Sequence, residues 1–202
     1  TSAIATRSNL SLSFNTVSAA KCFSPVPTRA RSLYTEDMNT TALTFPQECA
    51  LPLLSDGEPA PFEIYNPGGR APLVIVSDHA SRRVPRTLGD LGLSAEQFHK
   101  HIAYDIGADM ITRRLADRLD ARAVLGTYSR LVIDLNRQPG DPGCIPEISD
   151  GVEVPANKGL SEEQALCRIE TLHTHYNQAI NREITSLCRW DATPTAAFSI
   201  HV

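Results

Sequence analysis

The chain has 202 residues, which is enough for one domain of ordinary size with a substantial core. With 42% hydrophobic and 21% charged residues it has the composition of a soluble globular protein, and no apolar run is long enough to span a membrane. A formal net charge of −4 argues against a nucleic-acid or membrane-surface partner.

The cysteines are five in number and form no CxxC pair or close cluster; they are Cys22, Cys49, Cys144, Cys167 and Cys188. An odd and scattered set is typical of reduced thiols in a cytosolic protein, not of a disulfide framework or a zinc knuckle. We therefore expect a cytoplasmic protein.

Residues 1–37 differ from the rest of the chain. They are rich in Ser, Thr, Ala and Arg and contain no acidic residue before Glu36, as in a mitochondrial transit peptide. The chain begins with Thr, however, and Met38 opens a sequence of different texture. We favour Met38 as the true start, with residues 1–37 as upstream sequence read in frame, and expect the folded domain within residues 38–202.

Several short apolar runs predict strands. The run at 73–76 contains three β-branched residues and ends abruptly at Ser77, as expected of a buried strand. Further strand candidates lie at residues 62–65, 123–125, 131–133 and 196–200.

Two capping boxes predict where helices begin. Ser94 with Gln97 opens an apolar pattern of helical spacing that Gly107 divides, and Ser161 with Gln164 opens a long amphipathic helix that ends near Arg189. The alternation of strands and helices predicts an α/β fold, a sheet with helices on its faces. Residues 138–160 are rich in Pro and Gly and predict a long irregular loop of functional importance.

Two of the predicted strands are followed closely by a histidine, His79 after 73–76 and His201 after 196–200. If these strands are adjacent and parallel, both imidazoles lie at the edge of the sheet where ligands bind in open α/β folds. Two imidazoles and a carboxylate are a typical ligand set for catalytic zinc. Asp78 and Asp105 are the candidate carboxylates. Two alternatives stay open, because a lone histidine after a strand is often a loop or capping residue, and Asp105 could cap the helix after Gly107.

A second polar group follows the predicted strand 131–133. Asn136 and Arg137 would place an amide and a guanidinium at the edge of the sheet, where an arginine fork binds carboxylates. The alternative is an ordinary surface ion pair between Arg137 and Glu147 or Asp150, which would contribute little.

Four blocks, at residues 77–81, 101–108, 128–137 and 199–201, together resemble the N-formylglutamate amidohydrolase family in order and spacing. The resemblance extends from about residue 50 to the end. It implies a zinc-carboxypeptidase-like fold, a three-layer mixed sheet with helices on both faces in the phosphorylase/hydrolase-like class. It also implies metal-assisted hydrolysis of the amide bond of an N-acyl amino acid. The block at 134–137 is similar to the Asn-Arg pair that holds the substrate carboxylate in aspartoacylases and zinc carboxypeptidases.

Two departures from this family pattern change the expected site. Carboxypeptidase-like relatives use His-x-x-Glu for two ligands, whereas Arg82 stands at that spacing after His79. The carboxylate ligand must then come from elsewhere, and we assign it to Asp105. Family members also continue beyond the terminal histidine, so we expect this chain to lack a C-terminal portion.

The prediction is a zinc hydrolase of small N-acyl amino acids. Its site consists of the metal ligands His79, Asp105 and His201, the substrate-binding Asn136 and Arg137, and the catalytic Arg130, which would bind substrate or stabilise an oxyanion. The general base is not assigned; Glu147 and Glu153 are candidates, or the base lies in a missing portion. The alternatives are a metal-free carboxylate-binding domain that uses the two arginines and an inactive fragment of such a hydrolase.

Overall fold

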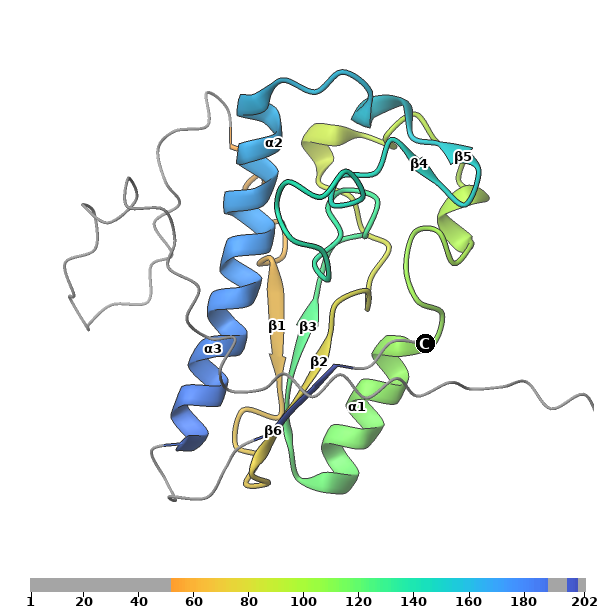
Figure 1. The fold of residues 1–202 in the computed structure, drawn as a ribbon. Helices are drawn as coiled ribbons and strands as arrows, with labels where there is room; N and C mark the ends of the chain where they lie inside the picture. The colour runs from red at the N-terminus through yellow and green to blue at the C-terminus, as the bar shows by residue number, and fades with distance from the viewer. Residues whose placement is uncertain (1–51, 189–195, 200–202) are drawn as a thin grey trace, which may run out of the picture.

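The computed structural model describes residues 52–188 and the backbone of residues 196–199. The segment at 1–37 and His201 lie outside the described residues. Figure 1 shows strands in the middle, with a long helix on one side and a shorter one on the other. Within the described part of the chain, no helix is both long and apolar enough to cross a membrane.

The strands and helices follow one another along the chain in an alternating order. They are β1 (Phe62–Tyr65), β2 (Leu73–Ser77), α1 (Ala108–Leu119), β3 (Arg122–Gly126), β4 (Ile148–Ser149), β5 (Val152–Glu153), α2 (Glu162–Arg168), a π-helical turn (Ile169–Thr174), α3 (His175–Cys188) and β6 (Ala196–Ser199). Short 3-10 turns lie at Arg86–Leu88, Gln97–His99 and Pro155–Asn157. The capping box of Ser161 and Gln164 starts α2 as predicted.

The main sheet has the strand order β1-β3-β2-β6. The edge strand β1 runs antiparallel to β3, while β2 is parallel to both β3 and β6. Val76 lies opposite Val124 of β3 and Ser199 of β6. The mixed α/β sheet is therefore confirmed, and so is the parallel pairing of the two strands that precede His79 and His201.

Alternating residues of β2 face different helices. Val74 and Val76 belong to a core with Leu172 and Tyr176, from the long helix. Ile75 belongs to a second core with Ala116 of α1. A strand whose two faces are both covered by helices reads as a continuous apolar run, which explains the sequence at 73–76. The carboxyl ends of β2 and β3 then meet at one edge of the sheet.

The predicted strand at 131–133 is wrong. These residues form turns, and the amide of Val132 donates to the carbonyl of Ser129 at 2.9 Å. Their side chains are nonetheless almost completely buried. An apolar run indicates that its residues are buried, but not which secondary structure they form, and here the buried residues form a turn.

The helical pattern before Gly107 is also interrupted. The backbone amide of Ser94 donates to Gln97 Oε1 at 2.7 Å, as in a capping box, but only a 3-10 turn at Gln97–His99 follows. Turns continue to Gly107, the N-cap residue, and α1 begins at Ala108. Two apolar residues on either side of Gly107, Ile106 and Met110, are 57% and 52% exposed.

The cysteines depart from the expectation of free thiols. Cys144 is a free, buried thiol, whereas Cys167 of α2 is disulfide-bonded. The scattered spacing gave no sign of this bond.

Gly126, the last residue of β3, lies against the chain next to His79. A β-carbon at Gly126 would come within 2.5 Å of the carbonyl oxygen of Asp78 and 2.6 Å of Leu135 Cδ1. We expect Gly126→Ala to lower the free energy of unfolding by about 1–3 kcal/mol, measured by denaturant titration, because backbone must move. Gly68→Ala, where nothing lies within 4 Å, is the control and should change it by less than about 0.5 kcal/mol. Equal effects of the two substitutions would refute this packing argument.

Candidate active site

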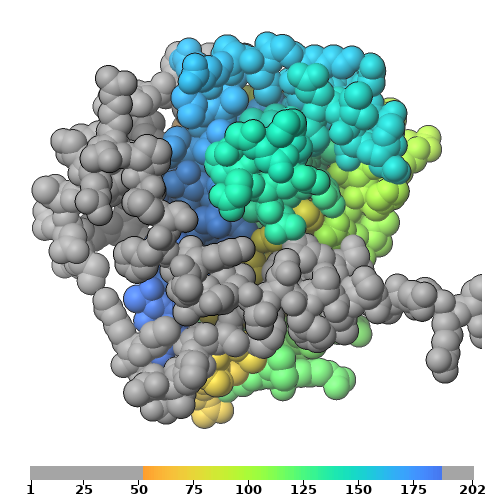
Figure 2. All heavy atoms as spheres, viewed as in Figure 1, coloured from red at the N-terminus to blue at the C-terminus, as the bar shows by residue number. Residues whose placement is uncertain are grey.

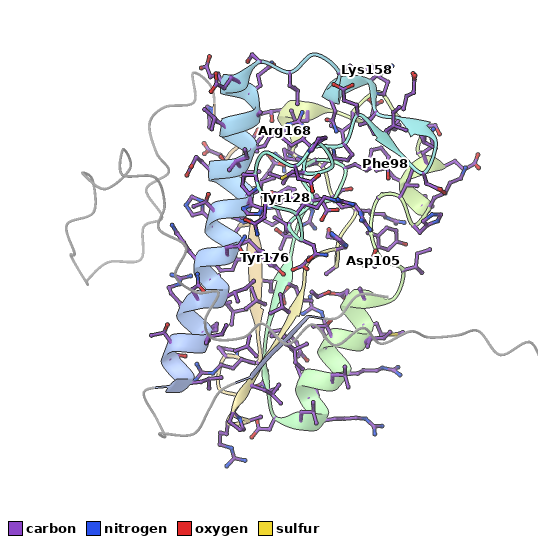
Figure 3. All side chains as sticks on the ribbon, viewed as in Figure 1. Phe98, Asp105, Tyr128, Lys158, Arg168 and Tyr176 are labelled. Carbon is purple, nitrogen blue, oxygen red and sulfur yellow. The ribbon has the colours of Figure 1, made fainter. Side chains whose placement is uncertain are left out.

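The candidate site lies at the carboxyl ends of the parallel strands. His79 comes two residues after β2 and is buried. Asp105 precedes α1, and its amide donates to the carbonyl of His79 at 3.0 Å. This backbone contact holds the loop after β2 against the loop before α1. Figure 3 shows Asp105 and Tyr176 on opposite sides of the strands, near the same level of the sheet.

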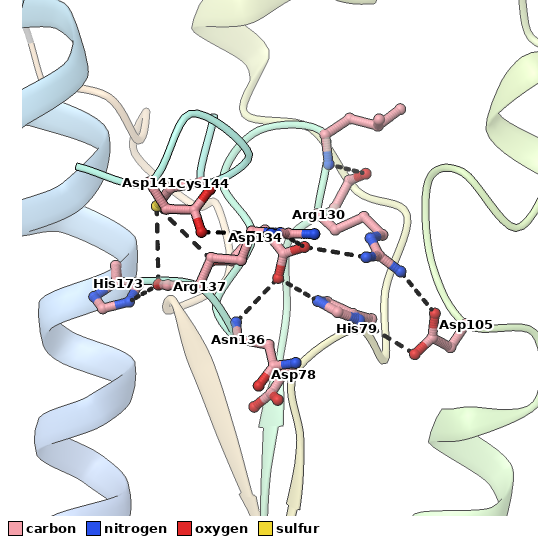
Figure 4. A network of polar contacts seen from close by, with 12 residues as sticks. Asp78, His79, Asp105, Arg130, Asp134, Asn136, Arg137, Asp141, Cys144 and His173 are labelled. Carbon is pink, nitrogen blue, oxygen red and sulfur yellow. Dashed lines mark hydrogen bonds and ion pairs between the residues drawn. The ribbon is translucent and has the colours of Figure 1, made fainter. Parts of the chain in front are cut away.

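Four side chains form a closed ring of ion pairs, which we call the charged ring. His79 Nδ1 lies 3.2 Å from Asp105 Oδ2, and His79 Nε2 lies 2.7 Å from Asp134 Oδ1. Arg130 completes the ring, donating from Nη1 to Asp105 Oδ1 and from Nη2 to Asp134 Oδ2, at 3.2 and 3.1 Å. Figure 4 shows these contacts. The predicted site residues His79, Asp105 and Arg130 are thus in direct contact.

The charges in this ring stabilise one another. Burial lowers the pKa of His79, but the hydrogen bonds that its ring donates to Asp105 and Asp134 outweigh this effect and raise the pKa to about 9. Burial raises the pKa of Asp134, but His79 and Arg130 outweigh it and lower the pKa to about 2. Two cations and two carboxylates balance, which is how a protein tolerates buried charge.

Asp105 does not cap the following helix. The residue at the N-cap position is Gly107, with φ of 92°, and no side chain caps the helix. Asp105 instead directs its carboxylate to His79 and Arg130. His101, four residues before Asp105, is exposed and pairs with Asp150 at 3.2 Å.

Asn136 and Arg137 lie at the rim of the charged ring. The amide of Asn136 donates to Asp134 Oδ1 at 3.0 Å. Arg137 Nε lies 3.6 Å from Asp134 Oδ2, and Nη1 lies 3.4 Å from Asp141 Oδ2. These are long contacts, and 48% of the Arg137 side chain is exposed. The alternative of a pair with Glu147 or Asp150 is wrong.

The loop that carries Arg137 is at the surface. In Figure 2 the teal residues around 135–145 form a raised part of the face in view, beside the blue helix. With 48% of its side chain exposed, Arg137 is accessible to a ligand while it remains next to the buried ring.

Asp78, the other candidate carboxylate, faces the long helix. Its Oδ1 accepts a hydrogen bond from Tyr176 Oη at 2.7 Å, and both residues are buried. Burial, with the nearby charge of Asp78, raises the pKa of Tyr176 well above its usual value, so the phenol keeps its proton. This contact ties the loop after β2 to α3.

The candidate general bases lie away from the ring. Glu147 and Glu153 are exposed, on or next to the β4–β5 hairpin, and Glu153 pairs with Lys158 at 2.9 Å. Neither carboxylate contacts the charged ring in the part of the chain that the structure describes.

The cavities of the molecule do not coincide with the charged ring. A polar hollow of about 160 Å³ lies at the ends of β2 and β3, lined in part by Ser81 and Gly126. A larger cavity of about 560 Å³ lies against α2, and the lining of neither cavity includes any of the predicted site residues. We place the site by its charges and strand ends, because volume alone would select the wrong place.

Asp134 was not assigned a role from the sequence. It stands between Ile133 and Leu135 in a run that is buried almost throughout. A carboxylate inside a buried apolar run must have charged or hydrogen-bonding partners. That pattern was the signal in the sequence for a site residue.

Comparison with known proteins was made with family models and with solved structures. The model of the N-formylglutamate amidohydrolase family matches residues 71–201. The chain belongs to this family. No curated protein matches it.

One similar solved structure is that of gene product Atu2144 from Agrobacterium tumefaciens. It superposes with a TM-score of 0.70 at 29% identity, over 74% of this chain and 59% of that one. The amidohydrolase family member described here therefore spans less than two thirds of that protein.

Proposed function

We propose that this protein hydrolyses the amide bond of an N-acyl amino acid, with N-formylglutamate, the substrate that gives the family its name, as the first choice. The observation that carries the proposal is the charged ring at the carboxyl ends of β2 and β3, the usual ligand position in open α/β sheets. We further propose that the mixed sheet is of the zinc-carboxypeptidase type.

The ring contains side chains of the kinds that bind zinc. An imidazole and two carboxylates are ligands that zinc accepts, and each ring nitrogen of His79 already contacts a carboxylate. One nitrogen can bind the metal while the other keeps its carboxylate, the arrangement that orients metal-bound histidines in many proteins. Among the described residues no three His, Cys, Asp or Glu side chains are placed to hold a metal. His201, two residues after β6, is our candidate for the remaining ligand, with His79 and Asp105.

A bound zinc ion would polarise the amide carbonyl and activate water. The protein's own side chains hold this centre in place. Arg130 fixes the carboxylates of Asp105 and Asp134 through one guanidinium, and these carboxylates fix the imidazole of His79. With 29% of its side chain exposed, Arg130 also presents positive charge to an oxyanion.

The rim of the ring supplies the substrate contacts. Arg137 offers a half-exposed guanidinium whose present partners lie at 3.4 and 3.6 Å, so a substrate carboxylate can replace them with a bidentate pair. Asn136, whose side chain is exposed beside it, would add an amide hydrogen bond. Both would bind the α-carboxylate of an N-acyl amino acid.

A metal-free carboxylate-binding domain is the second candidate. The observation in its favour is that the charges of the ring balance without a metal ion. In that case Arg137 binds the ligand and the ring serves as its support.

Hydrolysis measured with and without a chelator separates these functions. We expect the 202-residue chain, supplied with zinc, to release formate from N-formylglutamate, and a chelator to stop the release. Binding of N-formylglutamate without release, in a protein that takes up no zinc, would establish the carboxylate-binding domain instead. Full activity after complete removal of metal would contradict the zinc proposal.

A further inference from the structure

The long helix beside the site contains a π-helical turn. Arg168, Ile169 and His175 all have right-handed helical dihedral angles, so α2, the turn at Ile169–Thr174 and α3 form one continuous helix. Three consecutive residues within the turn, 171–173, are buried. A π-helical turn inside an α-helix is rare and is frequent at functional sites.

The turn changes which residues share a face of the helix. In a regular α-helix, residues five apart are separated by about 140° around the axis. In a π-helical turn the hydrogen bond joins residue i to i+5, so residues five apart lie nearly above one another. The turn therefore brings Arg168 and His173 to the same side.

Both residues contact the loop that carries Arg137. Arg168 is buried, and its Nη1 donates to the carbonyl of Val132 at 3.1 Å and to Asn157 Oδ1 at 2.7 Å. His173 Nε2 lies 2.9 Å from the carbonyl oxygen of Arg137. One helix thus holds residues 132–137 at both ends.

The hydrogen-bonding state of His173 follows from its partners. A carbonyl oxygen only accepts, so Nε2 carries the hydrogen and donates to Arg137. The side-chain amide of Asn177 donates from Nδ2 to His173 Nδ1 at 3.4 Å and to the carbonyl oxygen of His173 at 2.9 Å. Burial lowers the pKa of His173, which keeps the ring neutral.

We propose that His173 is a positioning residue for substrate binding: its Nε2–H fixes the backbone of Arg137, so that the guanidinium is held at the rim of the charged ring. This inference rests on the proposed function, because it assumes that Arg137 binds the substrate α-carboxylate. A fixed backbone leaves less conformational freedom to be lost when the substrate binds. The effect should appear in KM and not in the chemical step.

The test compares two substitutions at the same position. His173→Leu fills the space without a donor, and we expect it to raise KM for N-formylglutamate roughly three- to tenfold, with kcat within about twofold, since one neutral hydrogen bond is lost. His173→Gln restores an N–H donor and should recover most of the affinity. The α-amide of N-formylglutamate lacks the α-carboxylate that Arg137 is proposed to bind. KM for this compound should be unchanged by either substitution.

A neighbouring position provides the control. Thr171→Val alters a buried residue of the same turn and should leave both constants unchanged. If His173→Leu does not fold, Asn177→Ala removes the amide that holds the ring and should raise KM in the same direction. Unchanged KM in the leucine variant, a loss confined to kcat, or failure of glutamine to restore affinity would overturn the positioning role alone. A wild-type chain that neither binds nor hydrolyses N-formylglutamate would overturn the proposed function, and the positioning role with it.

Discussion

His79→Ala is expected to abolish zinc binding and hydrolysis together. His79 is the imidazole of the charged ring and contacts both Asp105 and Asp134. Loss of a residue that merely supports a metal ligand commonly reduces metal affinity 10- to 100-fold, so loss of the ligand itself should exceed about 100-fold. The measurements are zinc per chain by elemental analysis and formate release.

Stability must be measured alongside, because this substitution removes a buried cation. Leaving Asp105 and Asp134 with Arg130 as their shared partner would cost about 3–5 kcal/mol of unfolding free energy. His79→Gln keeps a polar side chain and serves if the alanine variant does not fold. His101→Ala is the matched control, since His101 is an exposed histidine paired only at the surface with Asp150. Zinc content that stays at the wild-type level in both His79 variants would show that His79 is not a ligand.

Arg137→Ala is expected to raise KM and leave zinc content unchanged. A charge-assisted pair contributes about 1.5–3 kcal/mol, which corresponds to a rise of roughly 10- to 150-fold in KM. The change should fall on KM because the carboxylate is held alike in ground and transition states. Steady-state kinetics with N-formylglutamate give both constants.

Arg137→Lys separates charge from geometry. Lysine retains the positive charge but not the planar fork, so KM should lie between those of the wild type and the alanine variant. If Arg137→Ala lost as much zinc as His79→Ala, or lowered kcat with KM unchanged, the roles assigned to the two residues would be wrong.

The sequence was most informative where one physical cause dominates. Strand β2 and its parallel partner β6 were predicted because a strand covered on both faces must be apolar throughout. Helix α2 was predicted to begin after Ser161 because the capping box is a local interaction. The contact between His79 and Asp105 was expected from the resemblance and from the position of His79 at the end of a strand, and it is present.

The remaining differences have long-range causes. The run 131–133 was predicted as a strand, but it is a turn held by Arg168 and Asn157, which donate to the carbonyls of Val132 and Leu131. Those donors lie more than twenty residues away along the chain, so no local pattern contains them. The π-helical turn at Ile169–Thr174 was likewise not predicted from the helical spacing of the sequence. Asp134 was overlooked because its buried partner His79 lies in the loop after β2, far from it along the chain.

Anomalous diffraction at the zinc edge, from crystals of the protein grown with zinc, tests the central claim most directly. We predict one strong anomalous peak next to the imidazole of His79 at the charged ring, with Asp105 among its neighbours. The same map would identify the side chain that supplies the remaining ligand. A crystal that contains zinc only elsewhere, with the ion pairs of His79, Asp105, Arg130 and Asp134 intact, would contradict the assignment of this ring as a metal centre.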